Sequence, residues 1–214
     1  MSPGIRWTAV VPVKRTEHAK SRLAGAQAHL RRQVALAVAA DTVAALQRSE
    51  SVAATIVVTD DDAAAQAVRT LGARVVADVP DAGLNPALTH GAERASAWYP
   101  EAGVVLVSAD LPAARAHEVD LALSECARHP RSFVCDVAGT GTTMLAGLPG
   151  ERLRPLFGRR SRSAHHSDGC IEVRRRDIVS VRRDVDTWVD LWDAARLGLG
   201  PATQQVWDQL DRLR

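Results

Sequence analysis

Carboxylates follow two apolar segments of the chain at the points where these segments end. Asp110 comes just after the run Gly103–Ser108, and Asp184 and Asp186 follow Ile178–Val181. Charged side chains are seldom buried unpaired, so these carboxylates either bind a cation or cap the helices that follow. Alternate residues of an extended segment share a face, so Asp184 and Asp186 can act together. If the two segments meet, the carboxylates suit Mg²⁺, which proteins bind through one or two carboxylates plus substrate phosphates.

A basic loop follows the first apolar run. Trp7–Val13 leads through Pro12 into a stretch that carries Lys14, Lys20 and Arg22. In an open α/β sheet, ligands bind at the carboxyl ends of the strands, and cations there favour a ligand that bears phosphate. We therefore expect an anionic ligand at this loop.

Three further segments carry polar groups that allow two interpretations. Gly139–Thr143 offers backbone N–H groups and hydroxyls that suit an anion, but it is also an ordinary turn sequence. The polar stretch Gly158–Gly169 is either a solvated basic loop or a clamp for phosphate and carboxylate groups. His165 and His166 are adjacent, so they make a poor metal pair, and we interpret them as electrostatic or structural. Asn85 precedes a helix that starts at a proline, and it is either an N-cap or a contact to a nucleotide base or ribose.

The composition excludes several classes of protein. The chain has 214 residues, 46% of them hydrophobic, and its 27 basic residues leave a net charge of only +2. A small anionic ligand therefore explains the basic clusters, and neither nucleic acid nor a membrane is expected as a partner. The three cysteines form no C-x-x-C pair, which argues against a zinc site or a disulfide framework. With no signal sequence or membrane-spanning run, the pattern predicts a soluble cytoplasmic protein.

Strand-like and helical patterns alternate along the chain, which predicts a doubly wound, mostly parallel sheet in one domain over residues 1–214. The expected strands are Trp7–Val13, Ala54–Thr59, Arg74–Ala77, Gly103–Ser108, Ser132–Asp136, Ile171–Val173 and Ile178–Val181. The expected helices are Gln27–Leu46, Ala63–Leu71, Pro86–Trp98, Ala116–Ala127 and Thr187–Leu197, followed by a short amphipathic helix near the C-terminus. That last helix either caps the core or docks on a second subunit, so a homodimer is one interpretation of it.

Six segments together resemble a known enzyme family. VPVKRTEHAKSRLA, LNPALTHG, SADLP, DVAGTGTTMLA, FGRRSRSAHH and RRDVDT are similar, in this order, to the guanylyltransferases of deazaflavin coenzyme biosynthesis, which act on phosphoenolpyruvate or 2-phospholactate. The resemblance spans about Trp7 to Ala202. It implies a single-domain, nucleotidyltransferase-type (Rossmann-like) fold with a mostly parallel mixed sheet and helices on both faces. It also implies transfer of GMP from GTP to the phosphate of a three-carbon acid, with release of pyrophosphate.

The resemblance also assigns roles to individual residues. Asp110 and Asp184 match the positions that bind Mg²⁺, and Asp186 is a third candidate ligand. The acid substrate would be held, largely through main-chain groups, by Thr142, Gly158 and Ser161. The triphosphate would be held by Lys14, Lys20 and Arg22, and the nucleotide would also contact Pro12 and Asn85. Lys20, Asp110 and Asp184 are the expected catalytic residues.

The resemblance leaves the acceptor acid and the activity open to alternatives. Phosphoenolpyruvate is favoured, and 2-phospholactate and 3-phosphoglycerate are the alternatives. A non-catalytic nucleotide-sensing domain of the same fold is a rival interpretation, and an enzyme that charges a sugar phosphate or a pterin is another. A phosphomonoester is largely dianionic at neutral pH, so its transfer needs charge neutralisation and alignment more than a general base. The expected partners are GTP, a small phosphorylated acid and a downstream transferase that takes the product.

Overall fold

A seven-stranded mixed sheet forms the centre of the computed structural model, which describes residues 5–14 and 28–211. The strand order is β3-β2-β1-β4-β6-β5-β7. The strands are β1 (Trp7–Pro12), β2 (Val52–Val58), β3 (Arg74–Val76), β4 (Gly103–Val107), β5 (Arg131–Cys135), β6 (Thr142–Gly147) and β7 (Ile171–Glu172). β6 runs antiparallel to both neighbours, β4 and β5, whereas the other pairs are parallel. The predicted mostly parallel mixed sheet is confirmed.

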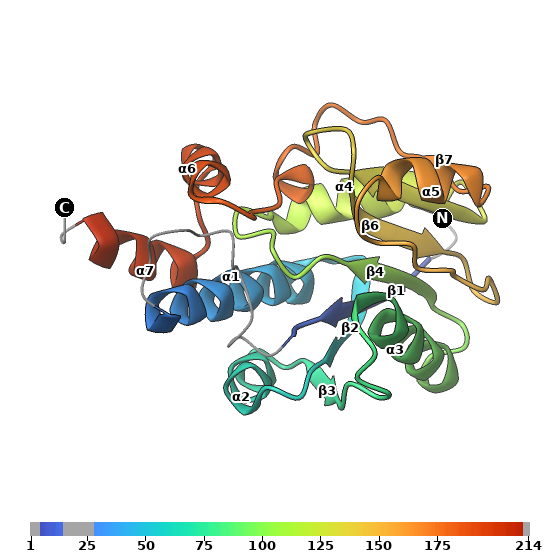
Figure 1. Cartoon of the computed structure of the whole chain (residues 1–214). Coiled ribbons are helices and arrows are strands. Elements are labelled where there is room, and N and C mark those ends of the chain that lie inside the picture. Colours follow the sequence, from blue (N-terminus) through green and yellow to red (C-terminus); the bar gives the residue numbers. More distant parts are fainter. Residues whose placement is uncertain (1–4, 15–27, 212–214) are drawn as a thin grey trace.

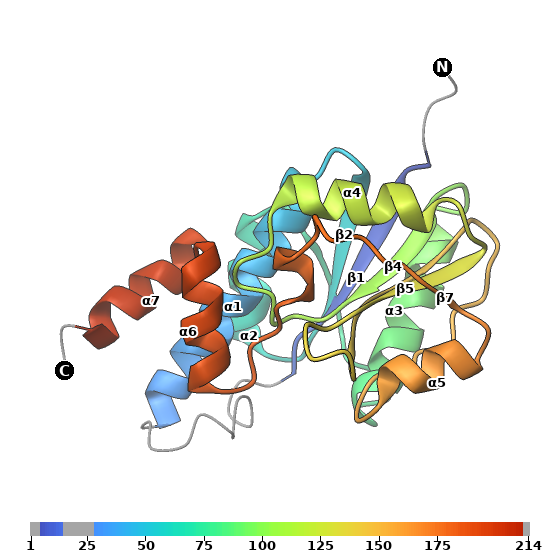
Figure 2. The same cartoon turned by 90° about the horizontal axis from the view of Figure 1, so that it is seen from above.

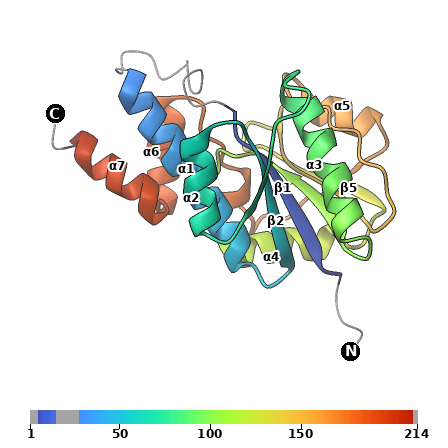
Figure 3. The ribbon, with the colours of Figure 1, turned by 90° about the horizontal axis from the view of Figure 1, so that it is seen from below.

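Helices cover both faces of this sheet (Figures 1, 2 and 3). The helices of the sheet layers are α1 (Ala28–Arg48), α2 (Asp62–Thr70), α3 (Leu84–Trp98), α4 (Ala116–Cys126) and α5 (Ser161–Ser167). Residues from α1, α2 and α4 share one apolar cluster with alternate residues of β1 such as Ala9 and Val11, whereas Val10 packs with α3 on the other face. Strands buried on both faces explain why these runs are almost continuously apolar in the sequence.

The chain reverses its direction of travel across the sheet between β1 and β4. It runs outward from β1 through β2 to β3, and α3 then carries it back to β4 on the other side of β1. The carboxyl ends of β1 and β4 therefore flank a topological switch point, which is where open α/β sheets bind ligands. Because β6 is antiparallel, its first residue, Thr142, lies opposite the end of β5 at this same edge.

Three segments differ from the sequence prediction. Ile178–Val181 is not a strand: its end belongs to the 3-10 helix η2 (Ser180–Arg182), and Ser180 N–H donates to Glu118 of α4 at 2.6 Å. Ile178 and Val181 are buried in the core without a neighbouring strand, whereas Val179 between them is exposed. The stretch Gly158–Gly169 is not a loop throughout, because it contains α5. β6 was not predicted, since its Thr-rich start follows a glycine-rich turn.

The two C-terminal helices pack against α1. They are α6 (Trp188–Leu197) and α7 (Pro201–Asp211). Asp41, buried in the middle of α1, accepts hydrogen bonds from Ala202 N–H and Thr203 N–H at 3.1 and 2.7 Å, so it caps the start of α7. A Cβ at Gly200 would lie 2.3 Å from Asp41 Cγ, so only glycine allows this approach. The C-terminal helix thus caps the core. Within the part of the chain that the structure describes, no helix is long and apolar enough to cross a membrane.

Candidate functional site

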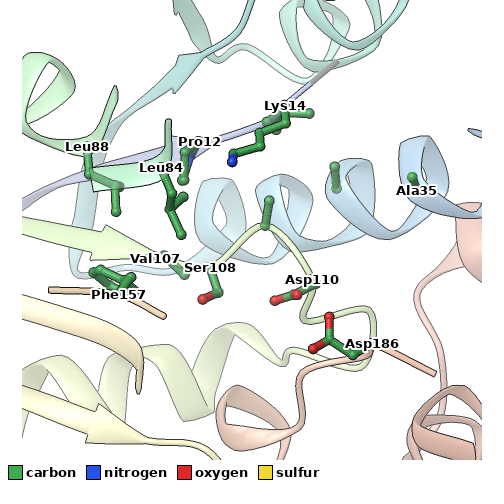
Figure 4. Close-up of a pocket in the computed structure, with 13 residues that line it drawn as sticks. Pro12, Lys14, Ala35, Leu84, Leu88, Val107, Ser108, Asp110, Phe157 and Asp186 are labelled. Atoms are coloured by element: carbon green, nitrogen blue, oxygen red, sulfur yellow. The ribbon is translucent and has the colours of Figure 1, made fainter. Parts of the chain in front are cut away.

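Two adjoining cavities lie at the switch point (Figure 4 shows the first). The first has a volume of about 300 Å³, and its walls are mostly apolar side chains of β1, α1, α3 and β4. The second has a volume of about 670 Å³ and is lined mainly by polar and charged side chains. The two cavities share lining residues, among them Lys14, Ser108, Asp110 and Asp186. The charged groups therefore stand at the boundary between an apolar and a polar compartment.

The predicted nucleotide-binding residues Pro12 and Lys14 line the apolar cavity. Pro12 ends β1, and Lys14 follows it with an exposed side chain, so the cation stands at the carboxyl edge of the sheet. Figure 4 shows the oxygens of Ser108, Asp110 and Asp186 on the walls of the same cavity. Lys20 and Arg22, the other predicted cations, lie outside the residues that the structure describes.

A main-chain hydrogen bond joins the two carboxylate segments. Val185 N–H donates to the Asp110 carbonyl at 3.0 Å, which ties the loop after η2 to the loop after β4. Asp110, Asp184 and Asp186 consequently line the same polar cavity. Asp110 is not a helix cap, since the N-cap of α4 is Arg115. Asp186 does not cap α6 either, because Thr187 is the N-cap in a capping box.

The carboxylates concentrate negative charge in this cavity. Burial, and after it the negative charges of Asp110, Asp136 and Asp186, raises the pKa of Asp184 to about 7. A carboxylate whose ionisation is opposed by other carboxylates is stabilised by a cation bound among them. The raised pKa of Asp184 therefore shows that this carboxylate lies among other negative groups, where a bound cation would favour its ionised form.

These oxygen donors fit a hard divalent cation. Among residues 5–14 and 28–211, no group of three or more His, Cys, Asp or Glu side chains is arranged to hold a metal ion, so a complete protein cage is not present in the described chain. Mg²⁺ does not require such a cage, since it binds through one or two carboxylates and completes its shell with water and substrate phosphates. Asp110 and Asp184 can supply that pair, with Asp186 beside them.

Asp136 is a site residue that the sequence prediction missed. It follows β5 as Asp110 follows β4, so the same strand-end signal was available. Its buried carboxylate accepts hydrogen bonds from Thr140 N–H and Gly141 N–H, both at 2.8 Å. A Cβ at Gly141 would lie 2.5 Å from Asp136 Oδ2, so glycine is required for this clamp. The clamp shapes the turn that leads into Thr142, a predicted acid-binding residue that lines the polar cavity.

The predicted acid-binding residues Gly158 and Ser161 meet Thr142 across the polar cavity. Gly158 (φ +130°) and Arg160 (φ +60°) both adopt backbone conformations that are rare for residues with side chains. Residues other than glycine that adopt such a left-handed backbone conformation, as Arg160 does, cluster at functional sites. Arg159 and Arg160, which belong to the stretch named as a possible clamp, add two guanidinium groups to the lining. Guanidinium groups match the geometry of carboxylate and phosphate.

The Ser161 main chain, which the resemblance assigns to the acid, makes a hydrogen bond within the protein. Its N–H donates to the Gly158 carbonyl at 3.1 Å as the chain turns into α5. Ser161 is buried and lines the polar cavity. A contact of Ser161 with the acid, through its main chain or its hydroxyl, remains a prediction.

The Asn85 side chain contacts the main chain of Phe157, which neither interpretation of the sequence had foreseen. It is not an N-cap, because Gly83 occupies that position of α3. Its side-chain amide accepts from Phe157 N–H at 2.9 Å and donates to the Phe157 carbonyl at 3.1 Å. Phe157 lines both cavities, whereas Asn85 is not among the residues that line them. The observed geometry gives Asn85 the role of positioning Phe157, and a nucleotide contact remains a prediction.

Comparison with known proteins gives the family. A family model described as "Guanylyl transferase CofC like" matches residues 7–161. The chain belongs to this family. Phosphoenolpyruvate guanylyltransferase of Thermomonospora curvata is 52% identical over 199 residues, which cover 93% of this chain and 87% of the relative. The enzyme of that name from Streptomyces coelicolor is 48% identical over 203 residues, with 94% and 96% covered. The family predicted from the six ordered motifs is confirmed.

Solved structures agree on the fold of this guanylyltransferase. A 4-diphosphocytidyl-2C-methyl-D-erythritol synthase is 10% identical and superposes with a TM-score of 0.62 over 90% of this chain and 99% of its own. A cytidylyltransferase from Leptospira borgpetersenii is 14% identical, with a TM-score of 0.58 over 97% and 94% of the two chains. The nucleotidyltransferase-type fold is thereby confirmed.

Proposed function

We propose that this guanylyltransferase transfers GMP from GTP to the phosphate of phosphoenolpyruvate and releases pyrophosphate. The observation that carries the proposal is the pair of adjoining cavities, one apolar and one polar, with carboxylates and a lysine on their shared boundary. The names of the relatives from Thermomonospora curvata and Streptomyces coelicolor support phosphoenolpyruvate as the acceptor.

The apolar cavity suits the nucleoside of GTP. Its walls come from Pro12, Val13, Ala35, Ala39 and Leu88. Ligand pockets are lined predominantly by apolar side chains, which can pack against the faces of a base. Lys14 stands where the triphosphate would cross from this cavity towards the carboxylates. Lys20 and Arg22 are proposed to extend this cationic surface along the triphosphate, with Lys20 stabilising the charge that develops on the leaving pyrophosphate. A nucleotide contact by Asn85 is retained as part of the proposal.

The polar cavity suits a small acid that carries a phosphate and a carboxylate. Thr142, Gly158 and Ser161 line it, with Arg159 and Arg160 beside them. Guanidinium groups bind both anions of such an acid with paired hydrogen bonds. The acceptor phosphate would point from there to the boundary of the two cavities, where the α-phosphate of GTP lies.

The chemistry requires alignment and charge neutralisation. An oxygen of the acceptor phosphate forms a bond to the α-phosphorus of GTP, while the bond from that phosphorus to the bridging oxygen of the β-phosphate breaks and pyrophosphate leaves. The acceptor phosphate is already largely dianionic at neutral pH, so no general base has to remove a proton. Asp110 and Asp184 would hold Mg²⁺, with Asp186 as a further ligand. When bound, Mg²⁺ neutralises charge on the phosphates and orients them for in-line attack.

The product of this reaction contains a new phosphoanhydride between GMP and the acid. Such a bond keeps the acid activated, so we propose that a downstream transferase consumes the product. We also propose a cytoplasmic location, because the three cysteines are free and buried, as is usual in reducing compartments. The apolar side chains of α6 that remain exposed, Val189 and Trp192, leave a homodimer as a further proposal.

Product analysis by mass spectrometry tests the function. The wild-type protein, incubated with GTP, Mg²⁺ and equal amounts of phosphoenolpyruvate, 2-phospholactate and 3-phosphoglycerate, should form mainly the guanylylated phosphoenolpyruvate and release pyrophosphate. Asp110→Asn should bind GTP but lose nearly all transfer, while the control Asp208→Asn, at an exposed position of α7, should be as active as wild type. GTP binding without pyrophosphate release from any acid would support the nucleotide-sensing alternative. A different major product would reassign the acceptor.

A further inference from the structure

One buried imidazole connects the three segments that line the acid side of the polar cavity. His165 belongs to α5, the helix that starts with Ser161, and its side chain has no solvent exposure. Its Nδ1 lies 2.9 Å from the Thr142 hydroxyl at the start of β6. Its Nε2 accepts a hydrogen bond of 3.0 Å from Leu156 N–H, two residues before Gly158.

The ring is also fixed by aromatic packing. The centroid of Phe133 on β5 lies 5.8 Å from the centroid of the His165 ring, and that of Phe157 lies 5.3 Å away in an edge-on arrangement. Phe157 is itself held by both atoms of the Asn85 amide. The ring therefore has one orientation, and its two nitrogens face different partners.

These partners determine which nitrogen carries the proton. A backbone N–H can only donate, so the Nε2 atom that accepts from Leu156 must be unprotonated. Burial lowers the pKa of His165 to about 4, so the ring is neutral near pH 7. A neutral imidazole without a proton on Nε2 carries it on Nδ1. The Nδ1–H group therefore donates to the Thr142 oxygen.

This proton placement has a consequence for Thr142. A hydroxyl has one proton to donate, and an oxygen that accepts from the imidazole has that proton available for another acceptor. Thr142 lines the polar cavity, where the proposed function places an anionic acid. A hydrogen bond from a hydroxyl to an anion is stronger than a bond between neutral groups.

We propose that His165 is a positioning residue that, as its Nδ1–H tautomer, presents the Thr142 hydroxyl as a hydrogen-bond donor to an anionic group of the acceptor acid. The same ring holds Leu156 and so the backbone that leads to Gly158. This inference rests on the proposed function for the identity of the acid, but the tautomer does not depend on it.

Two matched substitutions distinguish the contribution of Nδ1 from that of Nε2. His165→Asn places an amide near the Nδ1 position and can still donate to Thr142. His165→Gln places its amide near the Nε2 position, so it can serve Leu156 but leaves Thr142 without a donor. We expect His165→Gln to raise the KM for phosphoenolpyruvate about tenfold to a hundredfold, as for loss of one hydrogen bond to a charged group, and to leave the KM for GTP unchanged. His165→Asn should be clearly milder.

A double-mutant cycle tests the link to Thr142. Thr142→Val should raise the KM for phosphoenolpyruvate about as much as His165→Gln, whereas Thr142→Ser, which keeps the hydroxyl, should stay close to wild type. The double variant Thr142→Val/His165→Gln should be no worse than Thr142→Val alone, because the imidazole acts through the hydroxyl. If the rise in the KM for phosphoenolpyruvate in the double variant equals the product of the two single rises, the proposal is overturned. If His165→Gln does not fold, the comparison of Thr142→Val with Thr142→Ser still decides whether the hydroxyl is used.

Nitrogen NMR of the unliganded, ¹⁵N-labelled protein tests the tautomer directly. The His165 signals, assigned with His165→Asn, should show a neutral ring with its proton on Nδ1 at pH 7. A proton on Nε2, or a doubly protonated ring, would refute the inference. If wild-type protein forms no guanylylated acid, the proposed function fails, but this spectrum and the Kd of phosphoenolpyruvate for wild type, Thr142→Val and Thr142→Ser still test the tautomer and the hydroxyl. Equal Kd values for all three would refute the role of Thr142.

Discussion

Replacing Asp184 with asparagine should stabilise the metal-free protein while it abolishes transfer. Burial and the charges of Asp110, Asp136 and Asp186 raise the pKa of Asp184 from 3.8 to about 7. Between these values the folded protein holds a proton that the unfolded chain has released. The free energy of unfolding therefore falls as the pH rises from about 4 to about 7, and it stays at the lower level above that.

The size of this effect follows from the pKa change. A rise from 3.8 to about 7 corresponds to about 4 kcal/mol at most. Asp184 lies at a cavity and is only partly buried, so solvent screening reduces the value to about 2–4 kcal/mol. For a chain of this length, such a change shifts Tm by roughly 5–15 °C. Asp184→Asn should gain this amount over wild type at pH 8 and almost nothing at pH 4.

The assay is thermal and urea unfolding of both proteins in EDTA at several pH values between 4 and 8. The comparison with the variant is necessary because His165 contributes with the opposite sign. Its pKa is lowered from 6.5 to about 4, so its contribution to stability is lost as the pH falls through that range. The difference between wild type and Asp184→Asn removes the contribution of His165, and Asp208→Asn serves as the exposed control.

Magnesium should reverse the order of stability. In Mg²⁺ at pH 8, wild type should gain stability by binding the ion to its folded state, whereas Asp184→Asn should gain much less. A stability difference between the two proteins that is the same at every pH, or a variant that is less stable than wild type in EDTA at pH 8, would refute the argument that the carboxylates repel each other. An equal response of both proteins to Mg²⁺ would remove Asp184 from the metal site.

Three substitutions test the two sides of the site. Lys14→Ala should raise the KM for GTP about tenfold and leave the KM for phosphoenolpyruvate unchanged, and the loss should shrink at high salt because exposed charges are screened; a selective rise in the acid KM would contradict it. Ser161→Ala should raise the acid KM several-fold in steady-state kinetics, because its N–H is already bonded to Gly158; unchanged kinetics would return the contact to the main chain. Asn85→Ala should lower the free energy of unfolding in urea by about 1–3 kcal/mol, because it leaves Phe157 N–H without its acceptor. A rise mainly in the GTP KM of that variant would instead support a nucleotide contact.

The strand ends of the site could be predicted from the sequence because two signals coincide there. Asp110 follows a run that is apolar throughout, and a central parallel strand buried on both faces has that composition. Lys14 follows β1 in the same way. The carboxyl ends of parallel strands lie at one edge of a sheet, so the prediction of a mostly parallel sheet was sufficient to place both at that edge.

The acid side of the site was harder to predict because its elements depend on tertiary contacts. The start of β6 is polar and follows a glycine-rich turn, and it becomes a strand because β4 and β5 pair with it on both sides. The helix α5 is short and basic, without an apolar face that a periodicity could detect. His165 and His166 were interpreted as electrostatic or structural, and the structure buries His165 while it leaves His166 exposed. Nothing in their sequence tells which of the two is inside.

The two cavities are built from different stretches of the chain, and this separation has an evolutionary consequence. Every residue that lines only the apolar cavity precedes Asp110, whereas every residue that lines only the polar cavity lies between 136 and 161, apart from Asp184. On the proposed function, one contiguous segment of the chain therefore contains most of the residues that would distinguish one acceptor acid from another. On the proposed function, substitutions in residues 136–161 other than Phe157, which lines both cavities, would change the acceptor side without altering the walls of the apolar cavity. Related enzymes can diverge in one substrate while the other stays constant.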